Sequence, residues 1–409
     1  MNAKNNAVCA LSDNGAMAND DFYAVVPAGG VGSRLWPISR QERPKFLYDF
    51  LGSGRTMIQS TFDRLAMIAG EDHVAVICGA AHGAAVRAQL PRLCADNLFM
   101  EPVGRDSAAA IALPVAVMRL RHGEDVIVGS FAADHVIRDD QAFVDCVREA
   151  VAAARAGYVA TIGIAATRPS TAFGYIRQGA SLASEIPDAP HARRVEAFVE
   201  KPDAATAQGY LMTGEYRWNA GMFVMRAGTL LNHLRRLRPR MYEAVMELAQ
   251  CFVPCSNSQG ATVGVGSADA ASYDVAAAAE AMERIWPSVE KIAFDYAVAE
   301  PLASEGGVAV VPDGFGWDDV GDFNSVAALV PSVDGYNNKI IGESDRVVCL
   351  DSAGNVVAPG SKRLVALLGA DDLVVVDTPD ALLVAPRAWS QDVKRLVGLL
   401  SATGHEDLL

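Results

Sequence analysis

Short apolar runs alternate with helical patterns through the first third of the chain. The runs have the length and composition of buried strands and lie at 22–27 (FYAVVP), 73–78 (HVAVIC), 98–101 and 126–131 (VIVGSF). Helical patterns follow at 57–68, after a capping Thr56, at 80–90, and from Asp106 to about His122. This alternation predicts parallel strand pairing in an α/β layered domain. Ligands of such sheets bind at the carboxyl ends of strands, so we expect the loops after the runs to carry the chemistry.

The pattern changes from about Tyr158. Strand-like pieces are predicted at 158–165, 193–199 and 221–225, and helices at 274–284 and 322–330. Residues 252–273 are poor in charge and indicate a surface loop. From Tyr336 onward, short apolar runs separated by turns at 351–355 and 369–372 predict an all-β unit, closed by an amphipathic helix at 391–400. We therefore expect a mobile extension at 1–20, a catalytic domain at 21–330 and a C-terminal β domain at 331–409.

Composition narrows the class of protein. The 409 residues are 51% hydrophobic and carry a formal net charge of −14. This composition makes global disorder improbable and argues against nucleic-acid binding. The apolar stretch from Ala7 to Leu11 is too short for a signal peptide, and no run reaches the length of a membrane helix. Seven scattered cysteines favour thiols in a reducing cytosol, so we expect a cytoplasmic protein without a membrane partner.

A glycine-rich loop follows the first strand run. Gly29, Gly30, Gly32 and Ser33 open the segment, and four cations follow with one acid, which gives residues 28–45 a net charge of +3 (Arg34, Arg40, Arg43 and Lys45 against Glu42). Such glycines let backbone N–H groups converge on an anion, which favours a cradle for a triphosphate. A plain turn with surface arginines is the alternative. Leu35 stands where the dinucleotide fingerprint needs its third glycine, so a dinucleotide-dependent oxidoreductase is disfavoured.

The same loop begins a series of motifs in a recognisable order. They are GGVGSRLWPISRQERPKFL, EPVGRDSAAAIA at 101–112, FAADH at 131–135, FGYI at 173–176, FVEKP at 198–202, WNAGMF at 218–223, FDYAVAE at 294–300 and FGWDDVGDF at 315–323. The set resembles the sugar-nucleotide pyrophosphorylases, and WPISR with PKFL resembles their mannose-1-phosphate guanylyltransferase branch. The resemblance covers roughly residues 22–400.

The resemblance implies a fold and a reaction. The expected fold is a Rossmann-like nucleotidyltransferase domain with a mixed sheet, followed by a small C-terminal β domain similar to a left-handed β-helix. The expected reaction joins GTP and α-D-mannose 1-phosphate to GDP-mannose and pyrophosphate, with Mg²⁺ as cofactor, in a homodimer. The attacking phosphate oxygen is already anionic, so no general base is needed. The protein must align the two substrates and neutralise the charge at the α-phosphorus. The alternatives are another hexose 1-phosphate or nucleoside triphosphate, or a non-catalytic regulatory subunit that binds a sugar nucleotide.

The resemblance also implies roles for individual residues. Asp134 and Asp319 are the expected metal ligands; Asp318 is the neighbouring candidate, but its offset from Gly321 fits the family less well. The other roles are phosphate binding for Arg34, Lys45 and Lys201, sugar binding for Gly174, Glu200 and Asn219, and nucleotide binding for Gly29, Gly30, Gly32, Ser33, Glu101, Arg105 and Asp106.

Some of these residues have a simpler interpretation. Asp106 stands where the family commonly has asparagine, and it could accept from guanine, cap the following helix, or do both. The cations and the pair Glu200–Lys201 could be solvated surface groups, and we expect Trp218 to be a packing residue.

Overall fold

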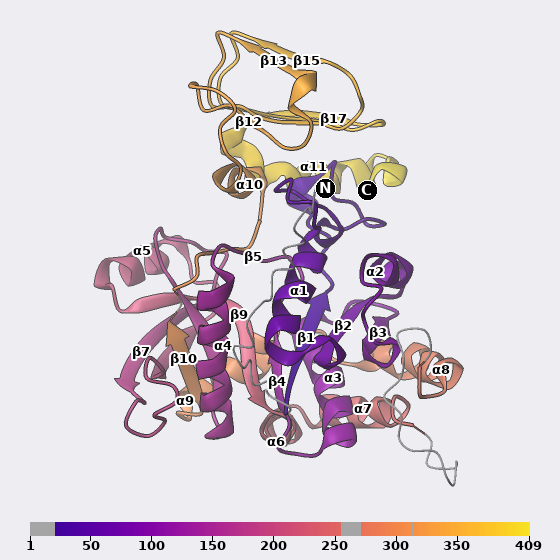
Figure 1. The fold of residues 1–409 in the computed structure, drawn as a ribbon, viewed down its shortest axis with the longest axis vertical. Coiled ribbons are helices and arrows are strands. Elements are labelled where there is room, and N and C mark those ends of the chain that lie inside the picture. Colours follow the sequence, from indigo (N-terminus) through magenta and orange to yellow (C-terminus); the bar gives the residue numbers. More distant parts are fainter. Residues whose placement is uncertain (1–20, 255–270, 313) are drawn as a thin grey trace, which may run out of the picture.

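The computed structural model describes residues 21–254, 271–312 and 314–409. The predicted extension at 1–20 and most of the predicted loop at 252–273 lie outside these residues. The centre of the molecule is a nine-stranded sheet in the order β3-β2-β1-β4-β9-β6-β10-β8-β7 (Figure 1). Its strands are β1 Phe22–Ala28, β2 Val74–Gly79, β3 Leu98–Glu101, β4 Ile127–Ser130, β6 Val159–Ala165, β7 Tyr175–Ser181, β8 Arg193–Val199, β9 Tyr216–Arg226 and β10 Val308–Pro312.

The sheet is mixed, as expected. Strand β1 pairs in parallel with β2 and β4, and β2 pairs in parallel with β3. Strand β9 pairs antiparallel with β4, β6 and β7, so one long strand joins the two halves of the sheet. Strand β7 and the first half of β9 were not predicted as strands. Residues 175–181 (YIRQGAS) mix polar with apolar positions, and they become a strand through pairing with β8 and β9.

Helices cover both faces of the sheet. Alternate residues of β1 face opposite layers: Phe22, Ala24 and Val26 join the core under α1 and α4, whereas Tyr23 and Val25 join the core under α3, α6 and α7. Helix α3 is apolar on all sides and is buried along residues 108–118. The helices are α1 Met57–Ala69, α2 Gly83–Gln89, α3 Asp106–His122, α4 Asp140–Arg155, α5 Ala204–Thr213, α6 Ala227–Leu237, α7 Pro239–Gln250, α8 Val275–Ile285 and α9 Glu300–Ser304.

The C-terminal strands form a coil of the β-helix type. Val347 pairs with Val365, and Val356 pairs with Val374, so successive parallel partners stand 18 residues apart. No such repeat was visible in the sequence, because the paired runs are short and their turns differ. The elements are β12 Lys339–Ile340, β13 Val347–Leu350, β14 Val356–Pro359, β15 Val365–Leu368, β16 Leu373–Asp377 and β17 Leu382–Pro386, with helices α10 Phe323–Leu329 and α11 Val393–Ala402.

The C-terminal domain packs on the glycine-rich loop. Helix α11 lies between the β coil and the loop (Figure 1), and the Trp36 indole N–H donates to the Leu408 carbonyl at 2.7 Å. Leu35 and Trp36 share a core with Phe323 and Val376. This contact places a catalytic-domain loop between the sheet and the β coil. Among the helices of the described residues, none is long and apolar enough to cross a membrane.

Candidate active site

The glycines of the loop allow three functional side chains to approach one another. Strand β1 ends at Ala28, and Gly32 has a left-handed backbone with a φ of 75°. A Cβ at Gly32 would lie 3.0 Å from the Lys45 side chain, and Cβ atoms at Gly29 and Gly30 would face the carboxylates of Glu101 and Asp134. Side chains larger than glycine at these loop positions would therefore crowd Lys45, Glu101 and Asp134.

Lys45 connects the two predicted metal aspartates. Its buried ammonium group lies 2.9 Å from Asp134 Oδ2 and donates to the Asp319 carbonyl at 2.8 Å and to the Val320 carbonyl at 3.3 Å. Two short strands bring the aspartate loops together: β5 Val136–Ile137 pairs antiparallel with β11 Trp317–Asp318. Residues 185 positions apart in the sequence (319 − 134) thus both contact the Lys45 ammonium group.

The two aspartates differ in their electrostatics. Burial opposes ionisation of Asp134, but Lys45 and His135 outweigh it and lower the pKa of Asp134. Burial raises the pKa of Asp319, and Asp318 and Asp134 add repulsion while Lys45 counteracts it. The Asp318 carboxylate instead accepts from the Val320 N–H at 2.8 Å, a local turn bond. Asp319 is therefore the better placed of the two neighbours to share a cation with Asp134.

The predicted sugar-binding residues line one small cavity of about 190 Å³. The Asn219 N–H donates to the Gly174 carbonyl at 2.8 Å, and a Cβ at Gly174 would collide with the Glu200 carboxylate. Glu200 is paired with Lys201 at 2.8 Å. Gly174, Glu200 and Asn219 come from three different segments of the sequence, and strands β7, β8 and β9 bring them together.

Asp295 is a cavity residue that the sequence analysis did not single out. It lines the same cavity, and its Oδ1 accepts from Asn219 Nδ2 at 2.6 Å. The FDYAVAE motif contains it, but neither spacing nor composition indicated that its side chain points to Asn219. A π-helix at Asp295–Ala299 sets this direction.

A larger cleft of about 740 Å³ adjoins this small cavity. The two share Ala172, Phe173, Trp317 and Asp319 in their walls. Arg34 lines the larger cleft, and its buried Nε has no hydrogen-bond partner within the described part of the chain. Arg168, which was not predicted, also lines it and lies 5.4 Å from the centre of the Trp218 ring.

Trp218 is a packing residue, as expected. It is 5% exposed, and its ring lies 5.0 Å from that of Phe173.

The predicted base-binding residues show a mixed outcome. Glu101 is 6% exposed, and its Oε2 has no hydrogen-bond partner among the described residues. Arg105 instead donates to the Pro287 carbonyl. Asp106 is exposed and has a φ of 66°, and its Oδ1 accepts from the Ser107 N–H at 2.8 Å. The prediction that Asp106 is the N-cap of this helix was wrong: the helix begins at Asp106, its N-cap is Arg105 without a side-chain cap bond, and the Ala108 N–H donates to the Ile292 carbonyl.

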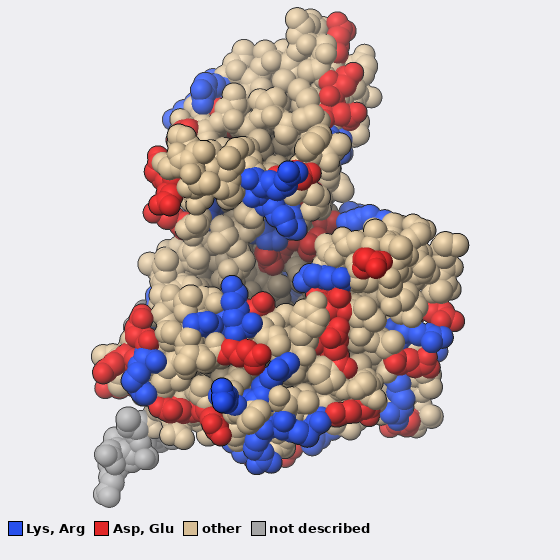
Figure 2. All heavy atoms as spheres, turned by 180° about the vertical axis from the view of Figure 1, so that it is seen from behind, with Lys and Arg blue, Asp and Glu red and all other residues tan. Residues whose placement is uncertain are grey.

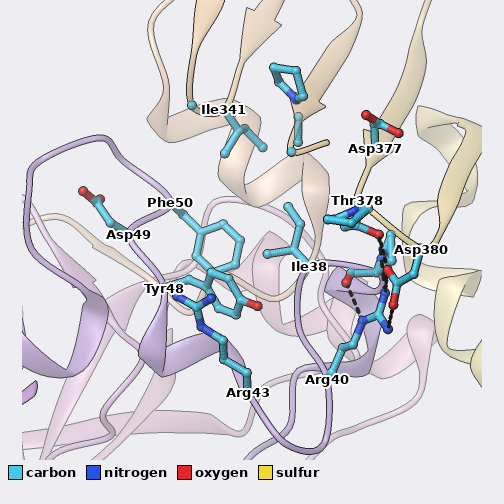
Figure 3. A pocket seen from close by; sticks show the side chains of 16 residues that line it. Ile38, Arg40, Arg43, Tyr48, Asp49, Phe50, Ile341, Asp377, Thr378 and Asp380 are labelled. Atoms are coloured by element: carbon cyan, nitrogen blue, oxygen red, sulfur yellow. Dashed lines mark hydrogen bonds and ion pairs between the residues drawn. The ribbon is translucent and has the colours of Figure 1, made fainter. Parts of the chain in front are cut away.

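Two cations of the loop do not belong to the site, which corrects the expectation that all four line one cradle. Arg40 forms a two-point ion pair with Asp380 of the C-terminal domain, with both distances 2.7 Å, and Arg43 lies 4.2 Å over the Tyr48 ring. Both face an open cavity of about 630 Å³ between the loop and the β coil (Figure 3). The charge pattern of the segment could not predict which of its side chains point away from the site.

The molecular surface gives no sign of a polyanion site on the face seen in Figure 2. Basic and acidic side chains alternate over the catalytic domain instead of gathering in one basic patch. This distribution agrees with the net charge of −14.

Comparison with known proteins identifies the family. A family described as nucleotidyl transferase matches residues 23–333, and one described as the MannoseP isomerase/GMP-like beta-helix domain matches residues 345–400. A mannose-1-phosphate guanylyltransferase of Escherichia coli (strain K12) is 37% identical over 96% of this chain and 76% of its own length. The xanthan biosynthesis protein XanB of Xanthomonas campestris pv. campestris (strain B100) is 38% identical over 95% of this chain and 75% of its own length.

A solved structure agrees with these relatives. The Thermus thermophilus protein titled mannose-1-phosphate geranyltransferase has a TM-score of 0.76 at 32% identity, over 93% of this chain and 99% of its own. The chain therefore belongs to the nucleotidyl transferase family, in the branch that contains the mannose-1-phosphate guanylyltransferases.

Proposed function

We propose that this protein is a mannose-1-phosphate guanylyltransferase that joins GTP and α-D-mannose 1-phosphate to GDP-mannose and pyrophosphate. One observation carries the proposal: the cavity of Gly174, Glu200 and Asn219 opens beside Asp319, whose backbone carbonyl accepts from Lys45, the ion-pair partner of Asp134. A sugar in that cavity has its phosphate next to a cluster of charged groups. Curated relatives named for this activity support the choice of reaction.

The residues divide the work by position. Glu200 and Asn219 bind sugar hydroxyls, and Lys201, paired with Glu200 and half exposed, neutralises the sugar phosphate. The backbone of Gly29, Gly30, Gly32 and Ser33 holds the triphosphate, with Arg34 and Lys45 as its cations. The sugar phosphate oxygen then attacks the α-phosphorus in line, and pyrophosphate leaves. Catalysis rests on alignment and charge neutralisation, since no proton has to be removed from the nucleophile.

Asp134 and Asp319 fit a magnesium ion. Oxygen ligands suit Mg²⁺, which usually takes one or two protein carboxylates and completes its shell with water and substrate phosphates. Mutual repulsion between the two carboxylates favours a cation near both. A bound Mg²⁺ supplies charge neutralisation at the phosphate oxygens.

We assign guanine recognition to Glu101 rather than to Asp106. Burial raises the pKa of Glu101, and its Oε2 lacks a partner among the described residues, whereas Asp106 already accepts from Ser107. A carboxylate can accept from both N1–H and N2–H of guanine. Arg105, held by Pro287, then shapes the turn beside the base.

The remaining assignments concern the oligomeric state, the domain limits and the cellular location. We propose a homodimer formed through the exposed apolar face of β13 and β15, where Val348, Leu350 and Leu368 are 52%, 59% and 74% exposed. The domain limits at 21–330 and 331–409 stay a prediction. A cytoplasmic setting is supported by the free thiols of Cys78, Cys251 and Cys349.

The test is a pyrophosphate-release assay with each nucleoside triphosphate and a panel of hexose 1-phosphates, with and without MgCl₂. We expect the highest kcat/KM with GTP and mannose 1-phosphate, and turnover only with Mg²⁺. A higher kcat/KM with another pair would replace the assigned substrates. Tight binding of GDP-mannose without turnover of any pair would indicate the regulatory subunit.

A further inference from the structure

The buried carboxyl group of Asp295 is a part of the site to which the proposed reaction gives no role. Asp295 begins the π-helix Asp295–Ala299 and lies in the wall of the sugar cavity beside Glu200 and Asn219. π-Helical turns are rare and occur often at functional sites. The turn places a third polar group among residues that bind a sugar.

The contact between Asp295 and Asn219 has a defined direction. The Gly221 N–H donates to Asn219 Oδ1 at 3.2 Å, and the Thr161 hydroxyl lies 2.9 Å from the same oxygen. Because a backbone N–H can only donate, the amide oxygen must face Gly221. The amide nitrogen then faces Asp295 and donates to its Oδ1 at 2.6 Å.

The amide nitrogen of Asn219 carries two hydrogens, and Asp295 accepts one of them. The second remains for a ligand in the cavity that Asn219 lines. We propose that Asp295 is a positioning residue for the hexose, which holds the Asn219 amide so that its second N–H meets a sugar hydroxyl. This inference rests on the proposed function and assigns part of its sugar recognition.

The charges around Asp295 make this role depend on pH. Burial raises the pKa of Asp295 to about 7; Glu200 and Asp106 add repulsion, and Lys201 opposes them. The ionised carboxylate accepts more strongly than the neutral acid. Hexose binding is therefore expected to tighten as the pH rises through about 7. Replacement of Asp295 by asparagine should remove this pH dependence of hexose binding.

The experiment compares Asp295→Ala and Asp295→Asn with wild type in steady-state assays, using the hexose 1-phosphate that wild type turns over best. In Asp295→Ala we expect the KM for the sugar phosphate to rise about tenfold or more, with kcat and the KM for GTP within about threefold. Asp295→Asn keeps an acceptor for Asn219, so its KM for the sugar phosphate at about pH 8 should stay within about threefold of the wild-type value. This variant should not show the change in KM that wild type shows as the pH passes through about 7.

Asp96→Asn is the matched control, because Asp96 is also a buried carboxylate and accepts from Ser272 outside the site. It should change neither KM. The proposal is overturned if Asp295→Ala leaves the sugar KM unchanged, raises both KM values equally, or is no worse than Asp295→Asn. If Asp295→Ala does not fold, a wild-type pH dependence in Asp295→Asn overturns it. Failure of mannose 1-phosphate in wild type would instead overturn the proposed substrate, and the Asp295 test would proceed with the sugar that is used.

Discussion

The side chains proposed to bind the sugar and those proposed to bind the nucleotide differ in how far they are already paired, although His135 Nδ1 and Trp317 Nε1 in the wall of the small cavity lack partners among the described residues. In the cavity, Asn219 is held at both ends of its amide and Glu200 is paired with Lys201. Of the side chains proposed to bind the nucleotide, Arg34 Nε and Glu101 Oε2 are buried without partners in the part of the chain that the structure describes. Buried polar groups are normally satisfied, so unpaired ones indicate where a ligand completes the structure. The proposed function therefore implies that Asn219 and Glu200 are preformed for the sugar, whereas GTP would supply partners to Arg34 and Glu101.

The largest effect is expected where the two regions meet. Asp134→Ala should lower kcat by about 10³-fold or more, because it removes a phosphate-neutralising group and leaves the buried Lys45 ammonium without its ion pair. The measurement is pyrophosphate release at saturating substrates, with circular dichroism to show that the fold is kept. Wild-type turnover in this variant would contradict the metal assignment.

A change in the preformed region should act on the sugar alone. Gly174→Ala places a methyl group against the Glu200 carboxylate, so that carboxylate must move away from its sugar-binding position. We expect the KM for mannose 1-phosphate to rise about 10- to 100-fold, which corresponds to the loss of one or two hydrogen bonds to a charged group. The KM for GTP serves as the internal control. Equal increases in both constants would show that the two regions are not independent.

A change in the region that nucleotide completes should act on the base alone. Glu101→Gln cannot accept from both guanine donors, so we expect kcat/KM for GTP to fall about tenfold while the KM for mannose 1-phosphate is kept. Inosine triphosphate lacks the N2 amine, so its kcat/KM should differ less between wild type and variant than that of GTP. An unchanged ratio of GTP to ATP use would remove Glu101 from base selection.

The smallest effect is expected outside both regions, at the ion pair between Arg40 and Asp380. The Arg40 side chain is 16% exposed and that of Asp380 48%, so solvent screens the pair substantially. Urea unfolding of Arg40→Ala, Asp380→Ala and the double variant should give a coupling free energy of about 1 kcal/mol or less. Activity should stay near wild type, and a large loss of kcat would show that the domain contact also supports the loop.

The sequence by itself determined the parts that depend on local pattern. Apolar runs and capping signals predicted β1 to β4 and α3, and the order of glycine, basic and acidic motifs predicted the family and the residue types at the site. These features could be predicted because strand burial and turn chemistry are encoded within a few neighbouring residues.

Only the tertiary structure decided the features that need distant contacts. It paired Arg40 of the basic loop with Asp380 of the C-terminal domain, placed Arg43 over Tyr48, aligned β13 with β15 across 18 residues, and aimed Asp295 at Asn219. In each case the side-chain direction or strand register depends on which distant segment packs against it, and a linear pattern does not contain that information. In this chain of net charge −14, tertiary packing thus divides the cations of one loop between the Asp134 cluster, which Lys45 joins, and the C-terminal domain, which Arg40 contacts.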